Sequence, residues 1–144
     1  MSNPPQFPLH DGLDEDHPRT WSDGGINGRS VLEPLLAGLA AHLAPGGVAL
    51  VTHNRFVGLD RSVHRLMQQG LDVEVGPTVT VPLTDERAAM LRRGHRAWGS
   101  VERFEAEPGV ICVGPQVLVE FVVLRVAQPD PAPPAIPPAI PPAA

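Results

Sequence analysis

Apolar residues recur along the chain with different spacings, and each spacing predicts one kind of element. Leucines three and four positions apart over residues 32–43 form one apolar face, which predicts an amphipathic helix that ends at Pro45-Gly46-Gly47. The nearly continuous apolar run over 47–53 is typical of a short strand buried in a parallel sheet. A helix, a Pro-Gly-Gly turn and then a buried strand is the order found in α/β proteins.

The rest of the chain after residue 54 alternates between helical and extended patterns. Asp60 is in place to cap a second helix that Gly70 would end, and Ser30 and Glu33 have the spacing of a capping box for the first. We expect extended segments at 71–76 and 79–82 and a helix over 84–96. The dense β-branched run at 117–126 predicts the strongest strand of the chain.

The two ends of the chain look different from this middle part. Residues 1–29 are rich in Pro, Gly, Asp and His, which predicts a long irregular loop. Residues 129–144 contain eight of the 18 prolines and no periodic apolar face. Proline lacks the backbone donor that helices and sheets need, so we expect a domain over 1–128 and a proline-rich disordered tail over 129–144.

Composition narrows the class of protein. Eleven basic residues against 16 acidic ones give a net charge of −5, so charge does not indicate a nucleic-acid partner. The single cysteine, Cys112, excludes an internal disulfide and a cysteine-rich zinc site. Glu120 and Arg125 interrupt the longest apolar run, and residues 1–5 lack the features of a signal peptide. We therefore expect a cytoplasmic protein with no membrane partner.

The tripeptide Asn3-Pro4-Pro5 is the most informative motif for chemistry. A rigid turn of this composition holds the Asn side-chain carbonyl and a proline backbone carbonyl in fixed positions. Two such acceptors can take both hydrogens of a planar NH₂ group and draw its lone pair out of conjugation, which makes the nitrogen a better nucleophile. The alternative is that these residues belong only to an irregular, proline-rich N-terminus.

The order of several motifs resembles one family. Asn3-Pro4-Pro5, the glycines at 24, 25 and 28, the leucine-faced helix, the turn at 45–47 and the following strand resemble the C-terminal half of class I S-adenosylmethionine-dependent methyltransferases of the HemK type. The resemblance covers roughly 2–76 and 118–127, the latter being similar to the family's final antiparallel strand. It implies an α/β, Rossmann-like fold and methyl transfer from S-adenosylmethionine to an amino, amide or similar nucleophile. It also implies that Asn3, Pro4 and Pro5 form the catalytic motif.

The chain departs from the family pattern in one site residue. The fourth motif position is an aromatic that stacks on the group to be methylated, whereas here it is Gln6, followed by Phe7. Gln6 and Phe7 are therefore the expected substrate-binding residues, and the methyl acceptor stays open.

A larger departure concerns the methyl donor. The family binds it through a glycine-rich strand–turn–helix and an acidic residue upstream of Asn-Pro-Pro, and residues 1–144 contain neither. The resemblance therefore implies a fold that lacks its N-terminal cofactor-binding strands. Three explanations stay open: a truncated gene product, a partner chain that supplies the donor-binding half, or a degenerate relative. A non-catalytic, methyltransferase-like interaction module is the alternative function.

The six histidines show no paired metal-ligand spacing, so no metal site is expected. His53 is the one to follow, because it ends the predicted strand where sites of α/β proteins gather. A non-catalytic role is still the stronger interpretation.

Overall fold

The computed structural model describes residues 1–8, 23–25, 27–96 and 107–130. The three predicted helices form within these ranges: α1 Leu32–His42, α2 Leu59–Gln68 and α3 Asp85–Arg96. A 3-10 turn that the sequence did not predict, η1 Arg55–Val57, precedes α2. The described strands are β1 Val48–Asn54, β2 Asp72–Val75, β3 Val79–Pro82, β4 Val110–Val113 and β5 Gln116–Ala127. The mixed α/β class is confirmed. Most of the predicted tail, 131–144, lies outside the described residues.

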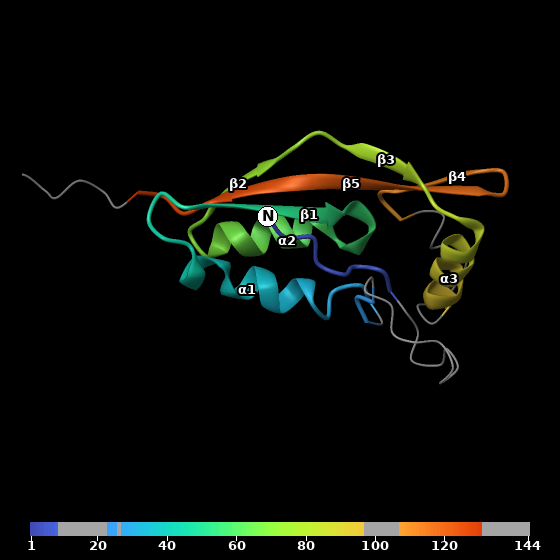
Figure 1. Cartoon of the computed structure of the whole chain (residues 1–144), viewed down its shortest axis with the longest axis horizontal. Helices are drawn as coiled ribbons and strands as arrows, with labels where there is room; N and C mark the ends of the chain where they lie inside the picture. Colours follow the sequence, from blue (N-terminus) through green and yellow to red (C-terminus); the bar gives the residue numbers. More distant parts are fainter. Residues whose placement is uncertain (9–22, 26, 97–106, 131–144) are drawn as a thin grey trace, which may run out of the picture.

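The sheet is built around β5, with which all four other strands pair (Figure 1). Each of these pairings is antiparallel, so the expectation that residues 47–53 belong to a parallel sheet is wrong for the described strands. A continuous apolar run indicates a strand that is buried on both faces, but it does not indicate whether the neighbouring strand is parallel or antiparallel. The first strand forms as predicted but is buried only at Val51, His53 and Asn54, and its long neighbour comes from the end of the domain.

The register fixes which strands share an edge of β5. Phe121 pairs with Asn54 of β1 and with Val79 of β3, so these two strands lie on opposite edges. Ala127 likewise pairs with Val48 of β1 and with Asp72 of β2. β2 and β3 therefore follow one another along one edge. Because β1 and β2 both run antiparallel to β5, they are parallel to each other, with α2 as their connection.

The burial pattern of β5 changes face along its length. Val117 and Val119 are buried at one end, whereas Val122, Leu124 and Val126 are buried at the other. Successive residues of a strand point to opposite faces, so the two ends of β5 bury opposite faces. All three helices nevertheless lie on one side of the sheet in Figure 1, so the alternation of buried residues shifts by one position along β5.

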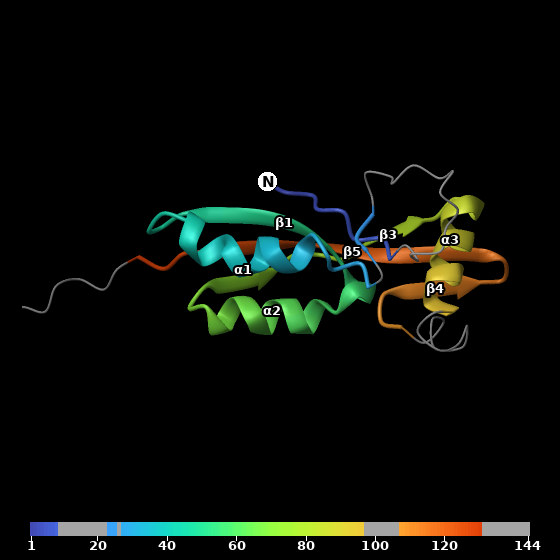
Figure 2. The ribbon, with the colours of Figure 1, turned by 90° about the horizontal axis from the view of Figure 1, so that it is seen from below.

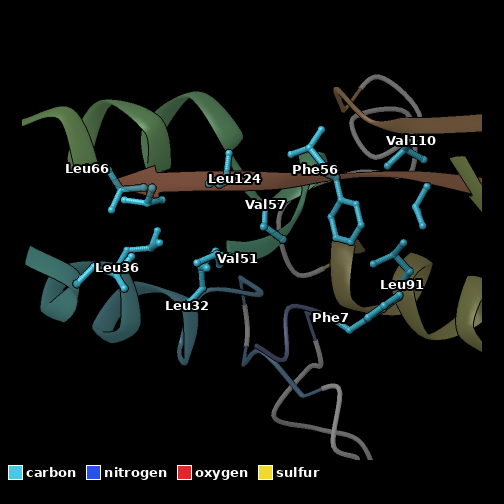
Figure 3. Close-up of a cluster of buried hydrophobic side chains, with 14 of the residues drawn as sticks. Phe7, Leu32, Leu36, Val51, Phe56, Val57, Leu66, Leu91, Val110 and Leu124 are labelled. Atoms are coloured by element: carbon cyan, nitrogen blue, oxygen red, sulfur yellow. The ribbon is translucent and has the colours of Figure 1, made fainter. Parts of the chain in front are cut away.

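The core is one cluster of buried apolar side chains between the helices and β5. Figure 3 shows Leu36 and Leu66, from the two helices, directed toward Leu124. At the other end, Leu91 of α3 is fully buried and belongs to the same cluster as Phe7 and Val110. Figure 2 shows α1 and α2 side by side under β1, β5 and β2, with α3 separate at the β4 end.

Both predicted helix caps are wrong. The N-cap of α1 is Val31, whose side chain has no atom that could form a hydrogen bond, and Glu33 pairs with three arginines. The N-cap of α2 is Gly58, at a φ of 83°, and Asp60 lies within the first turn. Caps depend on where the chain enters the helix, and tertiary ion pairs compete for the same side chains.

One strand was missed by the pattern. β4 pairs with the start of β5 in a tight hairpin, in which Val110 faces Val119 and Val113 faces Gln116. Four residues with one buried position give too short a signal to separate from a loop. Cys112 lies in this strand and is half-buried, a free thiol among the described residues.

Candidate functional site at the end of β1

The Asn3-Pro4-Pro5 segment, which the sequence predicts as a rigid turn, lies beside the carboxyl end of β1 and has no assigned turn in the structure. We keep the word turn as the name of this segment. Ser2 forms a parallel bridge with Val51: its N–H donates to the Leu50 carbonyl at 2.8 Å, and its carbonyl accepts from the Thr52 N–H at 3.0 Å. This bridge sits on the edge of β1 that faces away from β5. The next residues therefore follow the strand toward Asn54, where the chain leaves the sheet. The long N-terminal loop predicted from the sequence begins as a piece of extended chain.

The two predicted hydrogen-bond acceptors are both held in place. The Thr52 hydroxyl donates to Asn3 Oδ1, and Gln6 Nε2 donates to the Pro4 carbonyl at 3.2 Å. Asn3 is exposed, while Pro4 is buried and Pro5 is half-buried. A carbonyl oxygen has two lone pairs, so each of these oxygens keeps one for a further donor. The turn thus holds two carbonyl oxygens, one on an exposed residue and one on a buried residue, beside the end of the strand.

Gln6 and Phe7, the predicted substrate-binding residues, are both buried. Gln6 is only 3% exposed, and its amide also donates to the Thr52 carbonyl and accepts from the Asn54 N–H, each at 2.8 Å. The Phe7 ring is 8% exposed and meets the Phe56 ring edge-on, with centroids 6.0 Å apart. The Arg87 guanidinium lies 5.5 Å from the Phe7 centroid. A contact of either residue with substrate stays a prediction.

The glycine loop packs against the turn. Gly24 N–H donates to the Phe7 carbonyl at 2.8 Å, next to a parallel bridge between Phe7 and Asp23. A Cβ on Gly24 would lie 2.8 Å from the Gln6 Cα. A Cβ on Gly28, whose φ is 71°, would lie 2.5 Å from the Gln6 carbonyl oxygen. These two glycines permit a close backbone approach that any side chain would prevent.

A polar network behind the turn joins the loop to α1 and α2. Arg29 is 5% exposed and donates to the carbonyls of Val57 and Gly58 and to Ser62 Oγ, and it pairs with Glu33. Arg61 and Arg65 of α2 reach the same carboxylate. Burial raises the pKa of Glu33, but the Arg29 hydrogen bond and the three positive charges outweigh it and hold the pKa below its ordinary value.

His53 belongs to this network and is fully buried. Its Nδ1 lies 2.7 Å from the Asn54 carbonyl and its Nε2 lies 2.7 Å from Ser62 Oγ. The carbonyl can only accept, so Nδ1 carries the proton and Nε2 accepts from the serine. Burial lowers the pKa of His53 to about 4; the Asn54 bond opposes this shift and the Arg29 charge adds to it. The ring is therefore neutral at physiological pH, and its non-catalytic role stays a prediction.

Several residues of this region have no distinctive sequence signal. Thr52, Ser62 and Arg29 are common residue types at unremarkable spacings, and only the fold brings them together. Within the described ranges, no three metal-ligating side chains come together. No helix there is long and apolar enough to cross a membrane.

Comparison with known proteins adds one match. Over 86 residues the chain is 27% identical to a protein of Methanocaldococcus jannaschii that carries the assigned name protein N5-glutamine methyltransferase. The match relates this chain to methyltransferases. It covers 59% of this chain but only 44% of the relative, so the chain matches less than half of that protein's length. No protein-family model matches the chain. No solved structure matches it either.

Proposed function

We propose that this chain is the acceptor-binding part of an S-adenosylmethionine-dependent methyltransferase with a Rossmann-like fold. Its site would bind a primary amide or amino group at the Asn3-Pro4-Pro5 turn. The observation that carries the proposal is the pair of oriented carbonyl oxygens, Asn3 Oδ1 and Pro4 O, each fixed by one internal hydrogen bond. The methyltransferase relative supports the same class of reaction.

The chemistry of the turn follows from its two acceptors. One hydrogen of the acceptor NH₂ group would bond to Asn3 Oδ1 and the other to the Pro4 carbonyl. With both hydrogens held in the plane of the oxygens, the nitrogen lone pair is directed away from the turn and is less available for conjugation. The name of the relative suggests a glutamine side-chain amide as the acceptor, and such an amide has the required NH₂ group.

The described residues do not fit the methyl donor itself, which supplies an electrophilic methyl group on sulfur. Neither Gly24 nor Gly25 follows a strand of the described sheet, and β1 is followed by the short η1 turn. No glycine-rich turn between a strand and a helix is therefore present there to receive the donor.

We propose that a donor-binding unit completes the site along β1. On the edge facing away from β5, the N–H and carbonyl of Val48 and the N–H of Leu50 bond to no described residue. Ser2 already starts a parallel strand on this edge. Val48 and Val123, on the sheet face opposite α1 and α2, are 47% and 39% exposed. An edge with free backbone groups beside apolar surface suits an added strand and its helices.

The acceptor site can be tested without a donor. Propionamide titrated into ¹⁵N-labelled protein should shift the Asn3 side-chain NH₂ and Thr52 signals, because its NH₂ group reaches both oxygens. N,N-dimethylpropionamide, which has no N–H, is the matched control and should not shift them. Asn3→Ala should abolish the response. Equal shifts with both amides would overturn the proposal.

The enzyme and the non-catalytic module are separated by donor binding. The missing donor cradle among the described residues is the observation that favours the module. Calorimetry with S-adenosylmethionine should show binding when the chain is mixed with a donor-binding polypeptide corresponding to the unmatched part of the relative. No heat of binding in that mixture would leave the interaction module as the function.

A further inference from the structure

Gln6 stands out because its side chain is buried at the sheet edge and makes three hydrogen bonds to backbone. Its Nε2 donates to the carbonyls of Thr52 and Pro4, and its Oε1 accepts from the Asn54 N–H. Only 3% of the residue is exposed. Replacing this buried amide costs free energy, because each of its three backbone partners would lose a hydrogen bond.

The reason for this arrangement lies in the pairing of the preceding residues. Ser2 bonds to the Leu50 carbonyl and the Thr52 N–H, as one residue of a parallel strand does. Two positions later, the same ladder requires an N–H for the Thr52 carbonyl and a carbonyl for the Asn54 N–H. That position is Pro4, which has no N–H. The ladder cannot continue through the backbone.

We propose that Gln6 is the positioning residue of the acceptor site: its side-chain amide replaces the peptide group that Pro4 cannot supply. One planar group gives the N–H to the Thr52 carbonyl and the carbonyl to the Asn54 N–H. The same Nε2 also reaches the Pro4 carbonyl, which is one of the two oxygens of the turn. Gln6 thus continues the ladder and fixes the direction of a site oxygen. This inference rests on the proposed function.

The loop that contains Gly24 and Gly28 encloses Gln6 from one side. Gly24 and Gly28 lie against the backbone of Gln6, so this residue is enclosed between β1 and the loop. The Gln6 amide is directed toward β1, so it supports the turn and would not contact an acceptor bound at the turn. Asn3, by contrast, is exposed and held by Thr52. The role of Gln6 is therefore to orient Pro4, and its effect on binding passes through the turn.

Amide hydrogen exchange of the full chain tests the replaced ladder. Gln6→Leu keeps most of the side-chain volume and removes all three bonds of the side-chain amide. The Asn54 N–H should therefore exchange about tenfold faster, as expected for the loss of its one hydrogen bond. The Thr52 N–H, bonded to Ser2, should also exchange faster as the turn loosens. The N–H groups of Val51 and His53 face β5 and serve as internal controls. Unchanged exchange at Asn54 would overturn the proposal.

Gln6→Glu provides a rescue that loss of stability alone would not produce. A protonated carboxyl can still donate to the Thr52 carbonyl and accept from Asn54, whereas a carboxylate cannot donate. Burial beside two carbonyl oxygens raises the pKa of the new carboxyl. Exchange at Asn54 should approach that of the unmodified protein near pH 5, after correction for the intrinsic rate, and be faster at pH 8. Gln6→Leu should show no such recovery, and a recovery in both variants would contradict the proposal.

Propionamide binding then links the position of the turn to the site. Gln6→Leu should weaken this binding about tenfold. Gln69→Leu is the matched control, because Gln69 Nε2 also bonds to backbone carbonyls, at Leu36 and Arg65, but far from the turn. If the unmodified protein does not bind propionamide, the proposed function fails while the exchange result stands. If it binds and Gln6→Leu binds equally well, the positioning role fails. If Gln6→Leu does not fold, the pH dependence of amide exchange in Gln6→Glu still tests the proposal.

Discussion

The two edges of β1 are held by different contacts. On one edge, all seven residues from Val48 to Asn54 pair with β5, and apolar side chains cover this part of the sheet. On the other edge, the described bonds to it come from the backbone of Ser2 and the side chains of Asn3 and Gln6. The first edge carries the stability of the fold. The second carries the candidate site, in bonds that single substitutions can remove while the sheet persists.

The largest expected effect is on the β5 side. Leu124 is fully buried opposite Val51, so Leu124→Ala leaves a cavity and should lower the free energy of unfolding by roughly 3 to 4 kcal/mol. Urea denaturation measures this loss. Val123→Ala, on the exposed face one residue away, is the control and should cost under about 1 kcal/mol. Similar losses in both variants would mean that β1 and β5 are not the core of the fold.

The His53 network predicts a pH dependence of stability. The pKa of His53 is about 4 in the folded chain and about 6.5 when unfolded, so the unfolded state binds the proton more readily. Stability from this group is complete above pH 6.5 and is lost as the pH falls toward 4. The loss amounts to about 3 kcal/mol at most. Unfolding measured between pH 7 and 4 checks it.

Two variants assign this pH dependence to one residue. His53→Gln should flatten the curve between pH 6.5 and 4, because the ionising group is gone. His64→Gln, at an exposed position of α2, should leave the curve unchanged. The lowered pKa of Glu33 adds a loss of stability at lower pH, where that carboxylate takes up a proton. A curve that His53→Gln does not alter would place the dependence elsewhere.

A smaller effect is expected where the glycine loop meets the site side of β1. Gly28→Ala adds a Cβ at positive φ and 2.5 Å from the Gln6 carbonyl, which should cost about 2 kcal/mol and displace the turn. Gly70→Ala is matched in φ, at 78°, but meets nothing within 4 Å. The difference between the two in thermal unfolding isolates the contact with Gln6. Equal losses would show that this contact is unimportant.

The substitution with the smallest expected effect on stability, Thr52→Val, should have a clear effect on binding. Thr52→Val removes the hydroxyl that orients Asn3 Oδ1 and should change the free energy of unfolding by about 1 kcal/mol or less. Propionamide binding, followed by NMR titration, should nevertheless weaken several-fold. Thr80→Val, on the exposed strand β3, is the control for the loss of a hydroxyl. Unchanged binding in Thr52→Val would remove Thr52 from the site.

Local sequence patterns predicted most elements but not their pairing. The leucine spacing at 32–43, the apolar run at 47–53 and the β-branched run at 117–126 each became the expected helix or strand. These signals are local, because an element must bury the face that its own spacing creates. The strand β4 was not predicted, because four residues are too few to establish a period.

The sequence by itself determined where most elements lie and that the backbone of Asn3-Pro4-Pro5 is restricted, since proline restricts the backbone wherever it occurs. Only the tertiary structure decided that β5 pairs with β1 and that Gln6 points into the sheet edge. It also decided that Arg29, Ser62 and His53 form one network. These contacts join residues up to 79 positions apart, Val48 with Ala127, and no local pattern encodes which distant backbone group will be left without a partner.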